Sequence, residues 1–301
     1  MIIRFRKRGK SSGLGSLFGP RLGSRHAPGS GKAGSSELTR FPGTSATPPH
    51  PLQINSNYPL GAGLDQLAST RLGAFTACAR SRNGFAGGDY CEVVRTGTDT
   101  SLLVIADVMG RGAAAAPFAL RFGRTLRKVA ESTLNPSQIL SEVNRLLYPE
   151  LSDADTFITA MIVSVDTRDR YISVAGAGHC PLLAADNEGL VYSIEPEGVP
   201  LGILPETVFP HQLAMLGDAN WLCLYTDGVV DACDDHGQCF GVQRLAEVLV
   251  RAQQEHCGAA LFQERLFRAL DLFQPANASV DEQTCLVLAP HSCPELKLLA
   301  A

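Results

Sequence analysis

Residues 101–112 read SLLVIADVMGRG and combine an apolar run, an aspartate and a glycine turn. The apolar run 101–105 contains β-branched residues and is long enough for a buried strand but too short for a helix. It ends at Asp107, and a glycine turn then leads into an alanine-rich stretch. Because proline lacks a backbone N–H, Pro117 belongs in the first turn of the following helix, which we expect to begin near Ala116.

Outward from this stretch, further elements follow in groups rather than in strict alternation. Asn135 followed by Pro136 predicts the start of a second helix, with Asn135 as its N-cap. The polar residues 166–170 predict the turn of a hairpin. Apolar runs predict strands over residues 72–80, 157–165, 171–175, 181–184, 190–194, 221–225 and 284–288, and helical spacing predicts helices over 242–255 and 259–271. This order favours an α+β fold, a two-layer β-sandwich flanked by paired helices.

The chain divides by composition into an arm and one domain. Residues 1–52 carry nine Arg or Lys against Glu37 alone, a charge of +8, so the rest must carry −12 for the whole chain to reach −4. The arm is rich in Gly, Ser and Pro, which predicts a disordered basic segment over residues 1–59. Its role stays open between a solvated tail, a targeting segment and attachment to an anionic surface. Residues 60–290 are expected to form one domain, followed by a tail over 291–301.

The cysteines indicate a reducing compartment. There are nine of them, an odd number, and Cys233 and Cys239 are the closest couple, without a CxxC pair. This pattern suits reduced thiols in the cytoplasm better than a disulfide framework or a zinc site. The chain contains no run of about 18 apolar residues, so a membrane-spanning helix is not expected.

Four aspartates, each at the end of an apolar run or on a glycine turn, suggest a metal site. Two carboxylates about 4 Å apart repel by roughly 4 kcal/mol at an effective dielectric near 20. A hard divalent cation with oxygen ligands removes that repulsion, and Mg²⁺ or Mn²⁺ fits such a set. Water held by two such ions becomes a nucleophile near neutral pH, while the ions bind phosphoryl oxygens. An aspartate before glycine is equally an ordinary turn signal, so each residue taken singly also has that interpretation. The four are Asp89, Asp107, Asp227 and Asp281.

Taken together and in order, the motifs of the chain resemble the SpoIIE-like branch of the metal-dependent serine/threonine phosphatases, the family that includes protein phosphatase 2C. The matching segments are GGDY at 87–90, DVMGRG at 107–112, TFIT at 156–159, AGHCP at 177–181, the glycine-proline segment 198–204, YTDGVVD at 225–231 and DEQT at 281–284. This resemblance implies catalytic roles for Asp89, Asp107 and Asp227. It also implies two Mn²⁺ or Mg²⁺ ions, bound by Asp89, Asp107, the Val108 carbonyl, Asp227 and Asp281.

The last of these segments departs from the family pattern. Glu282 stands where a second aspartate is usual, and Gln283 replaces an apolar residue. Either Asp281 remains the ligand and the change is tolerated, or the second metal is weak. Gly88, Gly178, His179 and Gly228 match the family's structural positions.

Two polar residues in these motifs have competing interpretations. His179 is either a catalytic acid or a structural residue held by hydrogen bonds, and its glycine turn before proline favours the structural role. Arg111 either holds the substrate phosphate or pairs with an acid of the substrate, or it is a solvated cation of the turn.

The resemblance implies a phosphorylated protein substrate, of the kind represented by anti-sigma-factor antagonists in partner-switching circuits. It also implies a possible regulatory partner on the helices over 113–148. The alternative is a pseudophosphatase that keeps the fold as a protein-binding module. Nucleic-acid binding rests on the basic arm alone and is the weakest of the three hypotheses.

Overall fold

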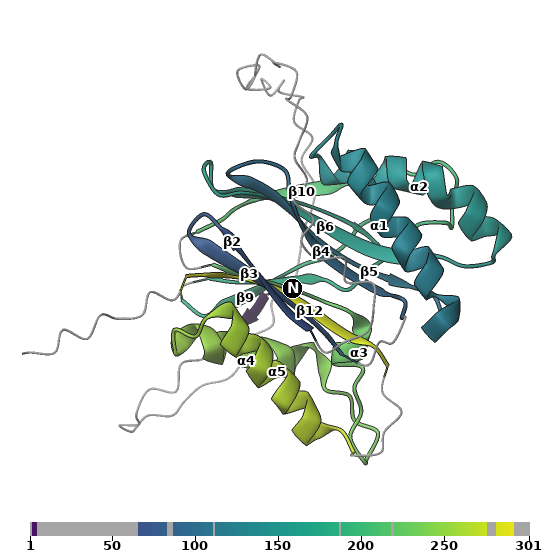
Figure 1. Cartoon of the computed structure of the whole chain (residues 1–301). Coiled ribbons are helices and arrows are strands. Elements are labelled where there is room, and N and C mark those ends of the chain that lie inside the picture. The colour runs from purple at the N-terminus through teal and green to yellow at the C-terminus, as the bar shows by residue number, and fades with distance from the viewer. Residues whose placement is uncertain are drawn as a thin grey trace, which may run out of the picture. The chain divides into compact units, whose positions relative to one another are not determined.

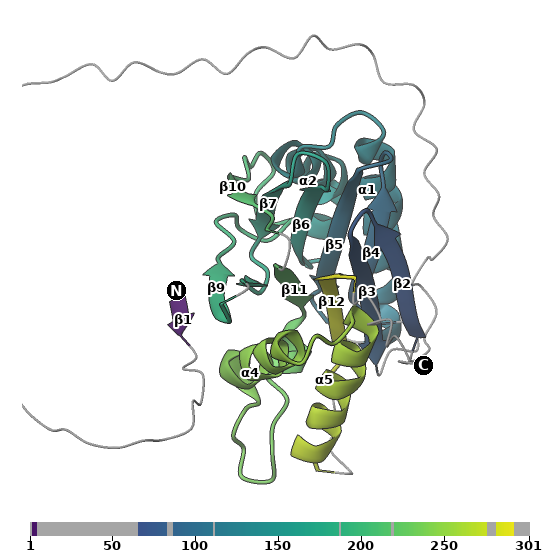
Figure 2. The same ribbon diagram turned by 90° about the vertical axis from the view of Figure 1, so that its left-hand side faces the viewer.

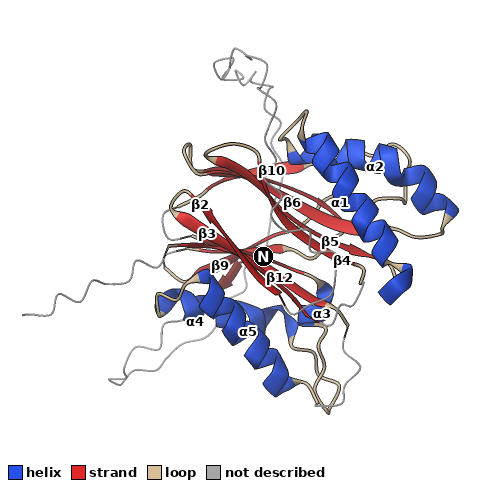
Figure 3. Cartoon of the chain, viewed as in Figure 1, coloured by secondary structure: helices blue, strands red, loops and turns tan. Residues whose placement is uncertain are grey.

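Two antiparallel sheets lie face to face between two pairs of helices (Figure 1). The computed structural model describes residues 2–4, 66–82, 87–110, 112–186, 188–217, 220–275 and 281–291. These residues belong to one compact unit of the chain. The helix, sheet, sheet, helix layering confirms the α+β class that the sequence predicts (Figure 3).

The five-stranded sheet has the order β10-β7-β6-β5-β4. Helices α1 and α2 pack on its outer face through a buried apolar cluster. The elements of this half are β4 (Asp89–Arg95), β5 (Thr100–Val108), α1 (Ala116–Ala130), α2 (Pro136–Asp153), β6 (Ile158–Asp166), β7 (Tyr171–Ala177) and β10 (His211–Met215), with a 3-10 turn at Gly112–Ala114.

The seven-stranded sheet has the order β1-β9-β8-β11-β12-β3-β2. Helices α4 and α5 cover its outer face, as the view in Figure 2 shows from the side. The elements of this half are β1 (Ile2–Arg4), β2 (Gln66–Leu72), β3 (Phe75–Arg82), β8 (Leu182–Ala185), β9 (Leu190–Ile194), β11 (Trp221–Tyr225), α3 (Asp227–Val230), α4 (Gly241–Gln254), α5 (Ala259–Phe273) and β12 (Gln283–Pro290).

Strand β5 is apolar along most of its length because both of its faces are buried. Leu102 and Val104 point to the cluster under α1 and α2, whereas Leu103 and Ile105 point to the cluster between the sheets. Successive side chains of a strand alternate between its faces, so a strand buried on both sides is apolar throughout. All four side chains are fully buried.

The predicted helix starts are confirmed. Helix α1 begins at Ala116 with Pro117 in its first turn. The Asn135 side chain caps α2 by accepting hydrogen bonds from the backbone N–H groups of Ser137 and Gln138. Residues 166–170 join β6 and β7 as the predicted hairpin.

Four strand predictions are corrected by the structure, and one correction is β4 over Asp89–Arg95, which the sequence did not predict. The run predicted as one strand over 72–80 is split by a turn at Gly73, whose φ of +56° reverses the chain between β2 and β3. Strand β10 was not predicted, because it is an edge strand with Leu213 and Met215 exposed and is defined by its pairing with β7. Residues 2–4, which fall within the predicted basic arm, form β1 and pair with β9.

The rest of the predicted arm and the tail after residue 291 lie outside the described residues. Within the described part of the chain, no helix is long and apolar enough to cross a membrane.

Candidate active site

The five-stranded sheet contributes two aspartates to one end of the sandwich. Asp89 begins β4, and Asp107 lies next to the last residue of β5. The antiparallel register places the two residues directly opposite each other. The Val108 N–H donates to the Gly88 carbonyl at 3.2 Å, so the register continues past the aspartates into the turn.

The seven-stranded sheet contributes the other two. Asp227 is the first residue of α3, two residues after the end of β11, and Asp281 lies two residues before β12. Because β11 and β12 are antiparallel neighbours, the end of one meets the start of the other. All four predicted aspartates therefore meet at the same end of the sandwich.

A single cavity collects these side chains. It has a volume of about 290 Å³ and is lined by Asp89, Asp107, Val108, Met109, Gly110, Phe157, Thr159, Asp227, Asp281 and Glu282. Asp227 is exposed, whereas the other acids of the set are half-buried. The predicted carbonyl ligand Val108 lines the same cavity, and a Cβ on Gly88 would come within 2.8 Å of its carbonyl oxygen. Only glycine at position 88 leaves that oxygen its space.

Thr226 links the two sheets across the site, although the sequence did not single it out. This fully buried residue donates from its hydroxyl to Asp89 Oδ2 at 2.9 Å and accepts from the Thr284 N–H at 3.0 Å. Its own N–H donates to the Thr284 carbonyl at 3.0 Å. The only signal available in the sequence was its place between the end of a strand and Asp227.

Thr226→Val is expected to destabilise the protein by about 1–3 kcal/mol, because the buried Thr284 N–H loses its acceptor and Asp89 loses a donor. Urea unfolding of the purified variant measures this change. Thr226→Ser keeps the hydroxyl and should retain most of the stability. A loss in Thr226→Ser without a loss in Thr226→Val would show that the methyl packing, rather than the hydrogen bonds, matters at this position.

Glu282 is a further acidic residue of the site. Its Oε2 accepts a hydrogen bond from the Asp89 N–H at 2.8 Å. A Cβ on Gly87 would lie 1.9 Å from the Glu282 carboxylate, so the longer side chain occupies space that only glycine leaves open. The sequence showed Glu282 as a departure from the family pattern but not that it reaches back to the segment of Asp89.

The site carries unbalanced negative charge. Burial raises the pKa of Asp107 to about 7, and Asp227, Glu282 and Asp281 add to this increase. Burial, followed by the charge of Asp107, also raises the pKa of Asp89 well above its usual range. Carboxylates held this close in a low dielectric favour protonation or a bound cation.

The donor set fits a hard divalent cation. Carboxylate and carbonyl oxygens are the ligands that Mg²⁺ and Mn²⁺ take, often with several retained waters. Among the described residues, no three His, Cys, Asp or Glu side chains are placed so that they could together hold a metal ion. The acids instead share the wall of one cavity, an arrangement compatible with ions that keep part of their water shell.

Comparison with known proteins places the chain in a family. The model of the family Stage II sporulation protein E (SpoIIE) matches residues 97–289. The chain belongs to the SpoIIE family. This confirms the resemblance that the motifs indicate.

Two similar relatives are Protein IcfG of Synechocystis, 27% identical over 223 residues, and Phosphoserine phosphatase RsbU of Bacillus subtilis, 26% identical over 179 residues. The first alignment covers 65% of this chain and 34% of IcfG, and the second covers 59% of this chain and 52% of RsbU. The chain thus spans between about a third and a half of the length of these relatives.

Solved structures share the fold at low sequence identity. The SiaA-PP2C domain of Pseudomonas aeruginosa aligns with a TM-score of 0.64 and 24% identity, covering 71% of this chain and 86% of that domain. RsbX in complex with magnesium aligns with a TM-score of 0.57 and 14% identity, covering 75% of this chain and all of RsbX. These likenesses confirm the protein phosphatase 2C-like layering.

The SpoIIE-family residue His179 has a structural environment. Its Nδ1 and the Thr159 hydroxyl oxygen share a hydrogen bond of 2.9 Å, and that hydroxyl also lies 3.4 Å from the Asp107 carbonyl oxygen. The Tyr225 backbone is a second hydrogen-bond partner of the His179 side chain. His179 is buried and does not line the cavity, and its neighbour Gly178 has a φ of +64°, a conformation that favours glycine. These contacts favour the structural interpretation of His179.

His179 should make the stability of the fold depend on pH. Burial lowers the pKa of His179 to about 4, partly offset by the Tyr225 backbone. As the pH falls below about 6.5, His179 binds a proton in the unfolded chain but stays neutral in the folded chain. The free energy of unfolding therefore drops by about 3 kcal/mol by pH 4. Urea unfolding at neutral and acid pH should show a smaller loss in His179→Asn. An unchanged difference between the two pH values would contradict the assignment.

Gln283, which departs from the SpoIIE-family pattern, is fully buried with its amide satisfied. It donates to the Gly228 carbonyl at 3.0 Å and accepts from Arg82 Nη2 at 2.7 Å. Arg82 also pairs with Asp271. The substitution therefore fits its place and ties α3 to the end of β3. The remaining SpoIIE-motif residue, Arg111, lies outside the described residues.

Proposed function

We propose that the chain is a metal-dependent protein serine/threonine phosphatase. The observation that carries this proposal is the meeting of Asp89 and Asp107 from one sheet with Asp227 and Asp281 from the other at one cavity. Family membership and the phosphoserine phosphatase activity named for the relative RsbU support the same function.

In this mechanism, Asp89, Asp107, the Val108 carbonyl, Asp227 and Asp281 would hold two Mn²⁺ or Mg²⁺ ions. When bound, such ions supply positive charge for the phosphoryl oxygens and lower the pKa of a water molecule. The protein supplies the geometry. Thr226 orients the Asp89 carboxylate, and Glu282 fixes the backbone of the same residue.

The substrate we propose is a phosphoserine or phosphothreonine on a protein. A cavity of about 290 Å³ bordered by the exposed Asp227 has room for a phosphate group and its side chain but not for a folded partner. The partner's surface would therefore rest on the rim, where Met109 is 43% exposed. By family resemblance, the partner is of the anti-sigma-factor antagonist type.

A regulatory partner is proposed on α1 and α2. Leu120 on α1 and Leu146 on α2 are exposed at 39% and 43%. Helix α1 follows the turn that continues from Asp107 and Val108, so a partner that shifts this helix would also shift two members of the site.

A binding module without turnover is the second candidate, and Glu282 is the observation that favours it. Its carboxylate lies in the cavity and adds a fifth acid to the set. Retention of all four aspartates favours the enzyme, and one experiment separates the two.

Hydrolysis of p-nitrophenyl phosphate and of a phosphoserine peptide is expected to require added Mn²⁺ or Mg²⁺ and to stop with a chelator, because uncompensated carboxylates repel phosphate. Restoring the metal should restore the rate. Absence of metal-dependent turnover on both compounds would overturn the enzyme proposal and favour the binding module. Isothermal titration with Mn²⁺ then shows whether the cation site itself exists.

A further inference from the structure

The loop between α3 and α4 folds into a small hairpin that places two cysteines together. Cys233 and Cys239 form an antiparallel bridge, and their sulfurs lie 3.7 Å apart. Both residues are exposed. Their proximity in sequence was evident, but only the hairpin brings the thiols into contact.

Backbone hydrogen bonds define the type of this cysteine pair. The Asp234 N–H donates to the Gln238 carbonyl at 3.0 Å, and the Phe240 N–H donates to the Ala232 carbonyl at 2.7 Å. The bonds thus flank the cysteines instead of joining them, which makes Cys233 and Cys239 a non-hydrogen-bonded pair. In such a pair the Cα atoms are about 4.5 Å apart, within the range that a disulfide spans.

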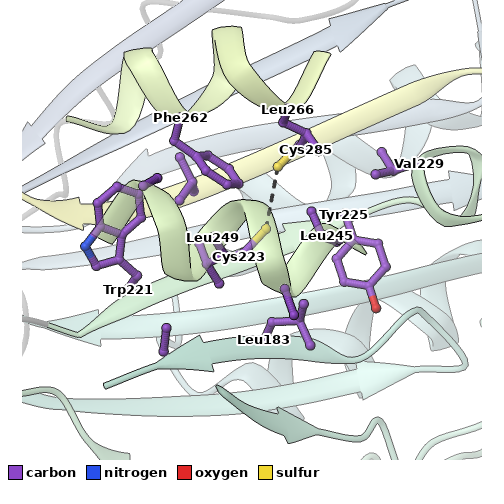
Figure 4. Close-up of a cluster of buried hydrophobic side chains, with 14 of the residues drawn as sticks. Leu183, Trp221, Cys223, Tyr225, Val229, Leu245, Leu249, Phe262, Leu266 and Cys285 are labelled. Atoms are coloured by element: carbon purple, nitrogen blue, oxygen red, sulfur yellow. Dashed lines mark hydrogen bonds between the residues drawn. The ribbon is translucent and has the colours of Figure 1, made fainter. Parts of the chain in front are cut away.

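A second pair of thiols in the same protein provides the contrast. Cys223 and Cys285 also have sulfurs 3.7 Å apart. In register, however, Cys223 faces Val287 and Cys285 faces Tyr225, so the two cysteines are diagonal neighbours with Cα atoms roughly 7–8 Å apart, beyond disulfide reach. Figure 4 shows them inside the buried cluster under α4 and α5. The two pairs therefore have the same sulfur–sulfur distance, but only Cys233 and Cys239 have a Cα separation that a disulfide can span.

We propose that Cys233 and Cys239 form a redox modification site that is converted to an intramolecular disulfide by a small-molecule disulfide of the glutathione type. The Cys233 thiol loses its proton, and the thiolate attacks one sulfur of the oxidant and releases one small thiol. Cys239, deprotonated in turn, attacks the Cys233 sulfur of this mixed disulfide and expels the second small thiol. Two electrons and two protons pass to the oxidant, which becomes two thiols.

The surroundings of the pair set its reactivity. The hydrogen bond with Cys239 raises the pKa of Cys233, and the Cys233 thiol donates to the Asp231 carbonyl at 3.1 Å. The site therefore reacts faster as the pH rises, because the thiolate is the attacking species. The Asp231 N–H in turn donates to the Asp227 carbonyl at 2.8 Å, so the hairpin continues directly from α3. The inference does not depend on phosphatase activity.

The test uses the full chain equilibrated in glutathione buffers of increasing oxidised fraction, quenched by alkylation and digested for mass spectrometry. We expect a peptide with a Cys233–Cys239 disulfide that dithiothreitol reduces. In the same buffers Cys223 and Cys285 should be recovered in alkylated form, which shows that they were free thiols at the quench. Cys233→Ser should leave Cys239 as a glutathione mixed disulfide without an internal link. The proposal is overturned if the two cysteines stay free in the most oxidising buffer that preserves the folded circular dichroism spectrum. It is equally overturned if each carries its own glutathione.

Discussion

Replacing Asp107 by asparagine is expected to abolish metal-dependent hydrolysis while making the metal-free protein more stable. Mutation of a residue that only hydrogen-bonds to a metal ligand typically costs up to roughly 100-fold in metal affinity or activity. Loss of the ligand itself should lower the rate by more than that. The gain in stability follows from the pKa of Asp107, which burial and neighbouring acids raise to about 7. Since the folded state prefers the protonated form, Asp107 contributes stability at acid pH that is lost as the pH rises from about 4 to 7.

Above pH 7 the ionised carboxylate burdens the metal-free fold, and removing it should raise the free energy of unfolding by about 2–4 kcal/mol. Urea unfolding in chelator and phosphate release in Mn²⁺ measure the two effects. Asp235→Asn removes an exposed acid from the hairpin outside the cavity and should change neither. A less stable metal-free Asp107→Asn protein would show that the carboxylate serves the fold rather than the cation.

Gly228→Ala is expected to disrupt both the fold near the site and its activity. A Cβ at this position would lie 2.0 Å from the Glu282 carbonyl oxygen. That atom belongs to the backbone, so α3 or the segment before β12 must move. Such overpacking typically costs about 1–3 kcal/mol, sometimes more. Asp227 precedes the substituted residue, and a displacement of about 1 Å in a catalytic group can cost on the order of 100-fold in rate.

Gly237→Ala is the matched control on the nearby hairpin. No atom lies within 4 Å of a Cβ there, although its φ of +73° is left-handed. This strain costs roughly 1–2 kcal/mol without moving the site. Unfolding curves and phosphate release, measured for both variants with saturating Mn²⁺, separate strain from collision. Full activity in Gly228→Ala would refute the collision.

The sequence predicted an element of this fold well wherever neighbouring residues carry the signal for it. Asn135 and Pro136 begin α2 as expected, because a cap and a proline act within one turn of helix. The apolar run before Asp107 became a central strand because burial on both faces demands it. Strand β10 escaped notice, since Leu213 and Met215 remain exposed and only pairing with β7 makes that segment a strand.

The candidate site shows the same division. The four aspartates were visible as a set because their motifs and order resemble a family, and the structure brings them to one cavity. Thr226 and Glu282 were not assigned, because their partners Thr284 and Asp89 lie 58 and 193 residues away in the chain. No local pattern encodes such a contact.

Local patterns along the chain account for the helix caps and for most of the strands, since propensity, capping and apolar patterning act over a few neighbouring residues. The tertiary structure decided what those residues meet. Pairing of β4 with β5 put Asp89 opposite Asp107, packing of the two sheets brought Thr226 to Asp89, and burial in the resulting site raises the pKa of both aspartates. Desolvation and charge repulsion depend on distance in space, and only the folded chain defines those distances.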